Sequence, residues 1–107
     1  MLVRDVGSHA AFRPEKMGKA ELCRAGLVYA GLNCFLPGQE HAAHAHAGQD
    51  KLYYVVEGSG EASVAEDTYA VSAGDLVLAP SGVMHSMKNT GTANLLVMVI
   101  LTPPPPR

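Results

Sequence analysis

The strongest constraint on the fold of this 107-residue chain is the regular punctuation of its apolar residues. Short apolar runs recur about every eight to twelve positions, with turn sequences such as Ala73-Gly74-Asp75 and Pro80-Ser81-Gly82 between them. The runs occupy residues 20–24, 27–36, 52–56, 61–65, 68–71, 76–79 and 95–101. No segment of helical length shows a period near 3.6 residues. The pattern predicts an all-β, antiparallel sandwich or barrel.

The two ends of the chain differ from this punctuated middle. Residues 1–15 form a mixed arm that could add an edge strand or swap onto a partner subunit. Pro103 to Pro106 cannot join a sheet ladder, because proline lacks a backbone N–H, so residues 103–107 predict an extended, solvated tail. The expected organisation is a single domain over residues 1–107, with the barrel at about 27–101.

Composition and charge exclude several classes of protein. A net charge of −2 gives no basic surface for nucleic acid or an acidic membrane. The longest apolar run, Leu95 to Leu101, is too short to span a bilayer, and the N-terminus lacks the apolar segment of a secretory signal. A cytoplasmic protein is therefore expected, with Cys23 and Cys34 as free thiols.

His44 and His46 are the first candidates for chemistry. On a strand, residues two apart project from the same face, so both imidazoles should point the same way. Two imidazoles on one buried face need a partner, and a divalent metal suits converging ring nitrogens. The alternative is a surface loop, because residues 41–47 are rich in alanine. His41 has the opposite parity and is expected to be exposed.

The spacing around these histidines extends the pattern. Residues 38–58 read G-x5-H-x-H-x4-K-x6-G, and residues 74–89 read G-x5-P-x-G-x2-H-x3-N. Together they resemble the two motifs of the cupin superfamily, whose first motif usually carries glutamate at the position of Lys51. The resemblance covers residues from about 27 to 101 and implies a single-domain cupin, an antiparallel double-stranded β-helix or jelly-roll barrel. Cupins include dioxygenases, isomerases, decarboxylases, sugar-binding modules and storage proteins, so the fold leaves the function open.

The resemblance also implies a ligand set. His85, from the second motif, would face His44 and His46 across the mouth of the barrel. Three neutral imidazoles would then bind one divalent transition metal ion, Fe, Zn, Ni or Mn, and leave positions open for water or substrate.

Lys51 complicates this expectation, because a protonated lysine beside a divalent ion is electrostatically unfavourable. Four outcomes are open: a three-histidine ion with Lys51 leaning away; an oxygen ligand from Gln49 or Asp50, the latter requiring a bulge; a role for Glu40, which shares the parity of the histidine pair and could pair with Lys51; or a metal-free barrel.

The leading functional hypothesis is a metal-dependent enzyme of the dioxygenase, isomerase or decarboxylase type that acts on a small, anionic molecule. Lys51 is its candidate catalytic residue, since an inward ammonium could hold a carboxylate or enolate oxygen. Phe35, Tyr53 and Met87 are candidate pocket-lining residues, with plain core packing as the alternative. The alternative function is a non-catalytic barrel that binds a sugar or an anion with weak or no metal.

A homodimer is the expected assembly, because the resemblance implies it. The strand LLVMVIL is apolar on both faces, which predicts that it is covered on each side.

Overall fold

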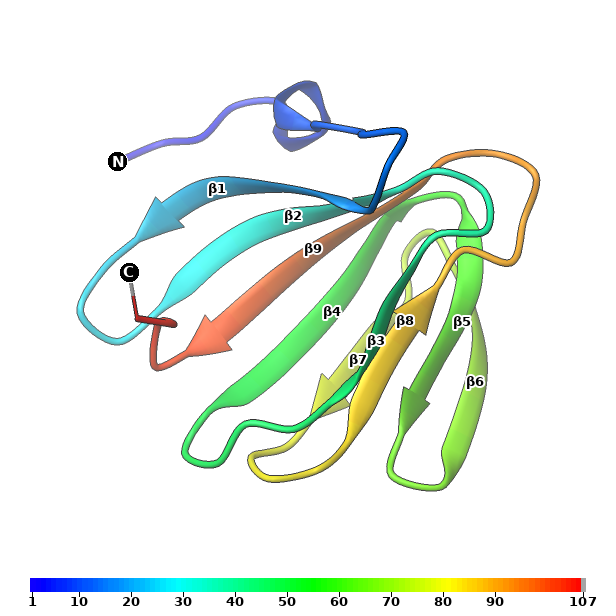
Figure 1. Cartoon of the computed structure of the whole chain (residues 1–107). Helices are drawn as coiled ribbons and strands as arrows, with labels where there is room; N and C mark the ends of the chain where they lie inside the picture. The colour runs from blue at the N-terminus through cyan, green and yellow to red at the C-terminus, as the bar shows by residue number, and fades with distance from the viewer. Residues whose placement is uncertain (107) are drawn as a thin grey trace.

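Two antiparallel sheets face each other and enclose the core in the computed structural model, which describes residues 1–106 (Figure 1). The first sheet has the strand order β1 (Gly18–Arg24), β2 (Tyr29–Phe35), β9 (Leu95–Thr102), β4 (Asp50–Glu57), β7 (Leu76–Ala79). The second has the order β3 (Glu40–His44), β8 (His85–Lys88), β5 (Ser59–Val64), β6 (Asp67–Ser72). A single 3-10 turn, η1 (Val6–His9), precedes β1. The all-β, antiparallel prediction is confirmed.

The core lies between the sheets because inward and outward side chains alternate along the strands. On β4, Lys51, Tyr53 and Val55 point inward and are buried, while Tyr54 is 38% exposed on the outer face. Apolar side chains from both sheets meet in one cluster that includes Phe35, Tyr53, Val55, Ala62, Val71, Met87, Leu95, Val97 and Val99. Burial of this cluster is the main stabilising contribution to the barrel.

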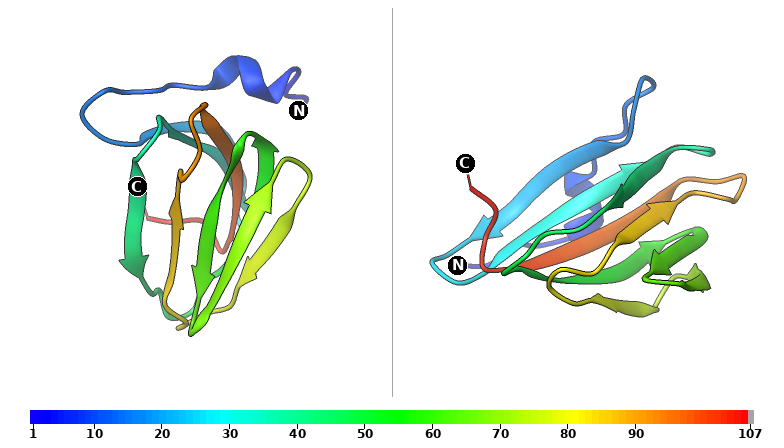
Figure 2. Two further views of the ribbon diagram at one scale, coloured as in Figure 1. Left: turned by 90° about the vertical axis from the view of Figure 1, so that its right-hand side faces the viewer. Right: turned by 60° about the horizontal axis from the view of Figure 1, so that its bottom comes forward.

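The N-terminal arm covers the outside of the first sheet and adds no strand within residues 1–15 (Figures 1 and 2). Val6, Ala10 and Phe12 pack against Leu32 and Leu96. The predicted burial of the last apolar run on both faces is confirmed for its first part, since Leu96 lies under the arm while Val97 faces the core.

The prediction that the C-terminal prolines form a solvated tail is wrong, because the tail is bound to the barrel. The tail crosses the open end of the barrel next to β1 and β2 (Figure 1). Arg24 Nη1 donates a 2.6 Å hydrogen bond to the Pro105 carbonyl, and Gln49 Nε2 donates one of 3.0 Å to the Pro103 carbonyl. The sequence pattern excluded a sheet ladder correctly, but side chains supply the donors that hold the tail.

The strands β3 and β8 were not among the apolar runs of the sequence, because both are short and polar side chains and histidines interrupt their apolar residues. They pair with each other, and His44 lies directly opposite His85. No helix within residues 1–106 is long and apolar enough to cross a membrane.

Candidate functional site

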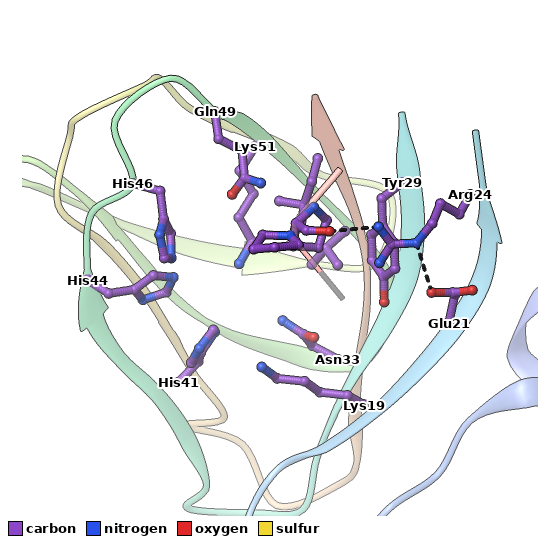
Figure 3. A pocket seen from close by; sticks show the side chains of 14 residues that line it. Lys19, Glu21, Arg24, Tyr29, Asn33, His41, His44, His46, Gln49 and Lys51 are labelled. Atoms are coloured by element: carbon purple, nitrogen blue, oxygen red, sulfur yellow. Dashed lines mark hydrogen bonds and ion pairs between the residues drawn. The ribbon is translucent and has the colours of Figure 1, made fainter. Parts of the chain in front are cut away.

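A cavity of about 410 Å³ opens at the end of the barrel where β1, β2, β3 and β4 meet the C-terminal tail. Histidines line one side, and β1, β2 and β4 contribute cationic and amide groups to the other (Figure 3). The lining residues are Lys19, Glu21, Arg24, Tyr29, Asn33, His41, His44, His46, Gln49, Lys51, Val99, Leu101, Pro105 and Pro106.

The three histidines of the two motifs come together. The ring centroids of His44 and His85 lie 4.2 Å apart, those of His44 and His46 5.1 Å, and those of His46 and His85 6.4 Å. His85 is 4% exposed and lies behind His44, whereas His46 is exposed at the rim. Alternation along a strand does not by itself explain why His44 and His46 lie close together, because β3 ends at His44 and His46 belongs to the following loop.

Backbone carbonyls orient two of these rings. His44 Nδ1 donates to the Ala42 carbonyl at 2.8 Å, and His85 Nδ1 donates to the Val83 carbonyl at 2.9 Å. A proton on Nδ1 leaves Nε2 with a free lone pair, and His85 Nε2 is buried without a hydrogen-bond partner. Burial lowers the pKa of both imidazoles, so each is held in the neutral form that binds metal ions or accepts a hydrogen bond.

His41 also belongs to the cluster, which corrects the expectation that it is exposed. The pairing of β3 with β8 is irregular between His41 and His44, so the two residues share a face although they are three apart. Their ring centroids lie 4.3 Å apart, and His41 Nδ1 is buried without a partner. Burial, together with the charge of Lys51, lowers the pKa of His41 to about 3. No signal in the sequence marks this bulge, since the alanines around it suit either register.

Lys51 points into the barrel and is only 6% exposed. Its Nζ lies 4.6 Å from the centre of the Tyr53 ring, a cation–π contact that offsets part of the cost of burying an ammonium group. Among residues 1–106, no carboxylate lies within ion-pair distance of Lys51. Burial lowers its pKa to about 8, with a further contribution from the charge of Lys19. The Lys51 side chain is therefore held inside the barrel and does not extend into solvent.

The net charge of the cavity lining is positive. Among the lining residues that the structure describes, Lys19, Lys51 and Arg24 are basic and Glu21 alone is acidic. Glu21 forms an ion pair with Arg24 at 3.4 Å, while Arg24 also holds the tail. The lining therefore presents more positive charge than its own carboxylate neutralises.

The three predicted pocket-lining residues do not line the cavity. Phe35, Tyr53 and Met87 are fully buried in the apolar core, as the packing alternative held. Their inward positions on the strands place them deeper between the sheets. Tyr53 still borders the site from the core side. Its ring makes the cation–π contact with Lys51, and its centroid lies 6.1 Å from that of the His85 ring.

Of the three alternative oxygen ligands, only Gln49 lines the cavity. Asp50 is exposed and accepts a 2.8 Å hydrogen bond from the Ser81 backbone N–H, so its carboxylate fixes the turn outside the barrel. Glu40 is exposed at the start of β3 and is not part of the lining. Neither acidic residue therefore supplies a carboxylate in place of the glutamate that the cupin motif usually has at the position of Lys51.

The donor chemistry of the cluster fits a transition metal ion, because it offers neutral imidazoles with Nε2 free and one buried Nε2 without a partner. The rings as they stand are not a ready-made site: within residues 1–106, no group of three or more His, Cys, Asp or Glu side chains is arranged to hold an ion.

Known proteins resemble the chain over most of its length. The family model described as "Cupin domain" matches residues 31–101. A solved structure, that of the protein TT1209 from Thermus thermophilus, superposes with a TM-score of 0.94 at 32% identity and covers 98% of this chain and 100% of that one.

Two curated relatives carry functional names. The 5-nitrosalicylic acid 1,2-dioxygenase of a Bradyrhizobium species is 30% identical over 95 residues, which are 86% of this chain and 45% of that protein. The oxalate-binding protein of Thermotoga maritima is 31% identical over 65 residues, 61% of this chain and 54% of that protein. The chain thus spans about half the length of these curated relatives.

Proposed function

The chain belongs to the cupin family, and we propose from its barrel and histidine cluster that it is a metal-dependent enzyme acting on a small, anionic molecule. His44, His46 and His85 would hold one divalent ion, Fe, Zn, Ni or Mn. The observation that carries the proposal is the buried, unpartnered Nε2 of His85, in contact with a second imidazole whose Nδ1 is also occupied by a carbonyl. A buried lone pair without a partner is unfavourable, and a metal ion would satisfy it.

A bound divalent ion would supply Lewis acidity, polarising a substrate oxygen, and iron would add access to oxygen chemistry. The residues of the chain do the remaining work. The Ala42 and Val83 carbonyls fix the orientation of two imidazoles, and Lys51 holds the negative end of the substrate. Pro105 and Pro106 cover the cavity beside the substrate and reduce its contact with water.

Metal content tests the proposal. Protein purified without added metal and then reconstituted should contain about one equivalent of a transition metal, and His85→Ala and His44→Ala should each retain less than about a tenth of this amount. His9→Ala is the matched control, because His9 lies on η1 outside the cavity and should leave metal content unchanged. Circular dichroism of each variant checks that the barrel is folded. Wild-type protein that stays below about a tenth of an equivalent after reconstitution rejects the metal site.

A second candidate function is a non-catalytic barrel that binds a small anion. It is favoured by the positive cavity lining and by the histidine rings not being arranged as a ready-made metal site within residues 1–106. The similarity to a protein named as oxalate-binding supports it too. Ligand binding without turnover, in protein that takes up no metal, would select this function.

A further inference from the structure

We propose that the wall of the cavity formed by Lys51, Lys19 and Asn33 is a carboxylate-binding site, and that the ligand is a short organic acid with a second oxygen group. The inference rests on the proposed function, because it names the substrate class of the same cavity. It places the carboxylate on the first sheet and the rest of the ligand toward the histidines of the second.

Three neighbouring strands supply this wall. Lys19 on β1 lies directly opposite Asn33 on β2, and Lys51 reaches into the same space from β4 (Figure 3). Asn33 is 3% exposed and Lys51 6%, so both are fixed by the surrounding sheet, whereas Lys19 is exposed at the mouth. Two ammonium groups and an amide N–H₂ are all hydrogen-bond donors, a set that matches the two oxygens of a carboxylate.

The charge of this wall is uncompensated. Among residues 1–106, neither Lys19 nor Lys51 has an ion-pair partner, and Glu21, the one acidic residue of this described lining, is paired with Arg24. An unpaired ammonium in a protein interior is costly, and an apolar side chain would pack there at lower free energy. A bound anion pairs with the ammonium group, so binding offsets the unfavourable burial of charge that is already present in the free protein.

The remaining groups narrow the class of anion. A neutral sugar would leave the charge of Lys51 unpaired. Phosphate is best recognised by a guanidinium fork or by backbone N–H groups, and the one lining guanidinium among residues 1–106, that of Arg24, is occupied by Glu21 and the Pro105 carbonyl. Val99, Leu101 and the tail prolines give the cavity an apolar side that accommodates a short carbon chain.

The experiment uses metal-free protein, so that its outcome does not depend on the metal site. Isothermal titration or ligand-observed NMR compares lactate with lactamide and pyruvate with pyruvamide, pairs of nearly the same size in which a neutral amide replaces the carboxylate. The carboxylates should bind at least about tenfold more tightly than the amides, and binding should weaken with added salt.

Variants assign the effect to the wall. Lys51→Met and Lys19→Met should each weaken lactate binding at least about tenfold, while Lys88→Met, an exposed lysine on β8 outside the cavity, should leave it unchanged. A melting curve for each variant confirms folding, and Lys19 is exposed enough for its replacement to be tolerated.

Three results would overturn the inference: equal binding of acid and amide, unchanged binding in both lysine variants, or inorganic phosphate binding more tightly than every carboxylate. None of these bears on metal content, so the carboxylate site and the metal site fail independently.

Discussion

At the residue scale, Lys51 explains most of what is unusual about this barrel. The family pattern has a carboxylate at this position, and the chain has an inward ammonium group that rests on the ring of Tyr53. Its side chain is buried, and Asp50 and Glu40 both point elsewhere. Such a charge lowers the stability of the folded state, and the carboxylate-binding proposal gives a reason to keep it.

Replacing Lys51 should therefore stabilise the metal-free protein. The pKa of the amine falls from 10.5 to about 8 on folding, which corresponds to ~3.4 kcal/mol at neutral pH. Because the unfolded chain keeps its proton more tightly, this cost is present in full below pH 8 and disappears as the pH rises to 10.5. Lys51→Met should raise the free energy of unfolding by about 1 to 3 kcal/mol at pH 7, with a smaller gain above pH 10.

Urea denaturation at a series of pH values measures this difference. Lys88→Met is the control, because an exposed substitution should change stability by less than about 0.5 kcal/mol. A Lys51→Met protein less stable than wild type at pH 7 would mean that the ammonium has a compensating partner.

His41 makes a prediction of the same sign on the acid side, because burial lowers the pKa of this group too. Its pKa is about 3 in the folded protein and 6.5 when unfolded, so the unfolded chain binds a proton first as the pH falls. Stability should decline from pH 6.5 toward pH 3. His41→Phe fills the same space without titrating and should retain about 2 kcal/mol more stability than wild type at pH 4, relative to pH 7.5, a value reduced for partial solvent screening. Parallel urea titrations of metal-free protein that show equal acid sensitivity would contradict the buried position of His41.

At the element scale, two irregular segments, the bulge in β3 and the C-terminal tail, complete the lining of the cavity. The bulge in β3 turns His41 inward, and the proline tail closes the cavity through hydrogen bonds from Arg24 and Gln49. Both features lie where hydrophobic periodicity carries no information, since a bulge changes which face a residue occupies and prolines have no ladder to join.

The link between Arg24 and the tail can be measured by a double-mutant cycle. Arg24→Met removes the charged donor to the Pro105 carbonyl and should cost about 1 to 2 kcal/mol of unfolding free energy in the full chain. In a chain shortened to end at Thr102, the same substitution should cost about 1 kcal/mol less, because the tail is gone. The ion pair with Glu21 and the contact with Tyr29 are lost in both backgrounds and cancel. An equal cost in the two backgrounds would show that the tail contributes nothing through Arg24.

At the scale of the whole molecule, the outer face of the first sheet carries exposed apolar side chains beside the barrel. Leu76 lies opposite Tyr54, and Leu78 lies opposite Leu52. Leu76 is 63% exposed and Leu78 55%. Neighbouring exposed apolar groups of this kind favour association, and they agree with the homodimer expected from the family resemblance.

The assembly is tested by sedimentation or light scattering. Wild-type protein should have twice the chain mass of 11.2 kDa, and the double variant Leu76→Glu, Leu78→Glu should have the chain mass itself while keeping its circular dichroism spectrum. A wild-type protein that is monomeric at a concentration of about 100 μM would reject the dimer. If the double variant is still dimeric, the dimer interface lies on another surface of the barrel.

The sequence by itself determined the all-β, antiparallel class, the residues of both motifs and the shared face of Lys51 and Tyr53 on one strand, because alternation on a strand is a local property of the backbone. The tertiary structure alone decided that His41 joins the cluster, that Phe35 and Met87 lie in the core, and that the proline tail lines the cavity. These placements depend on a register irregularity, on depth between the sheets and on hydrogen bonds between residues distant in the chain. Such non-local terms have no counterpart in the spacing of residues along the sequence.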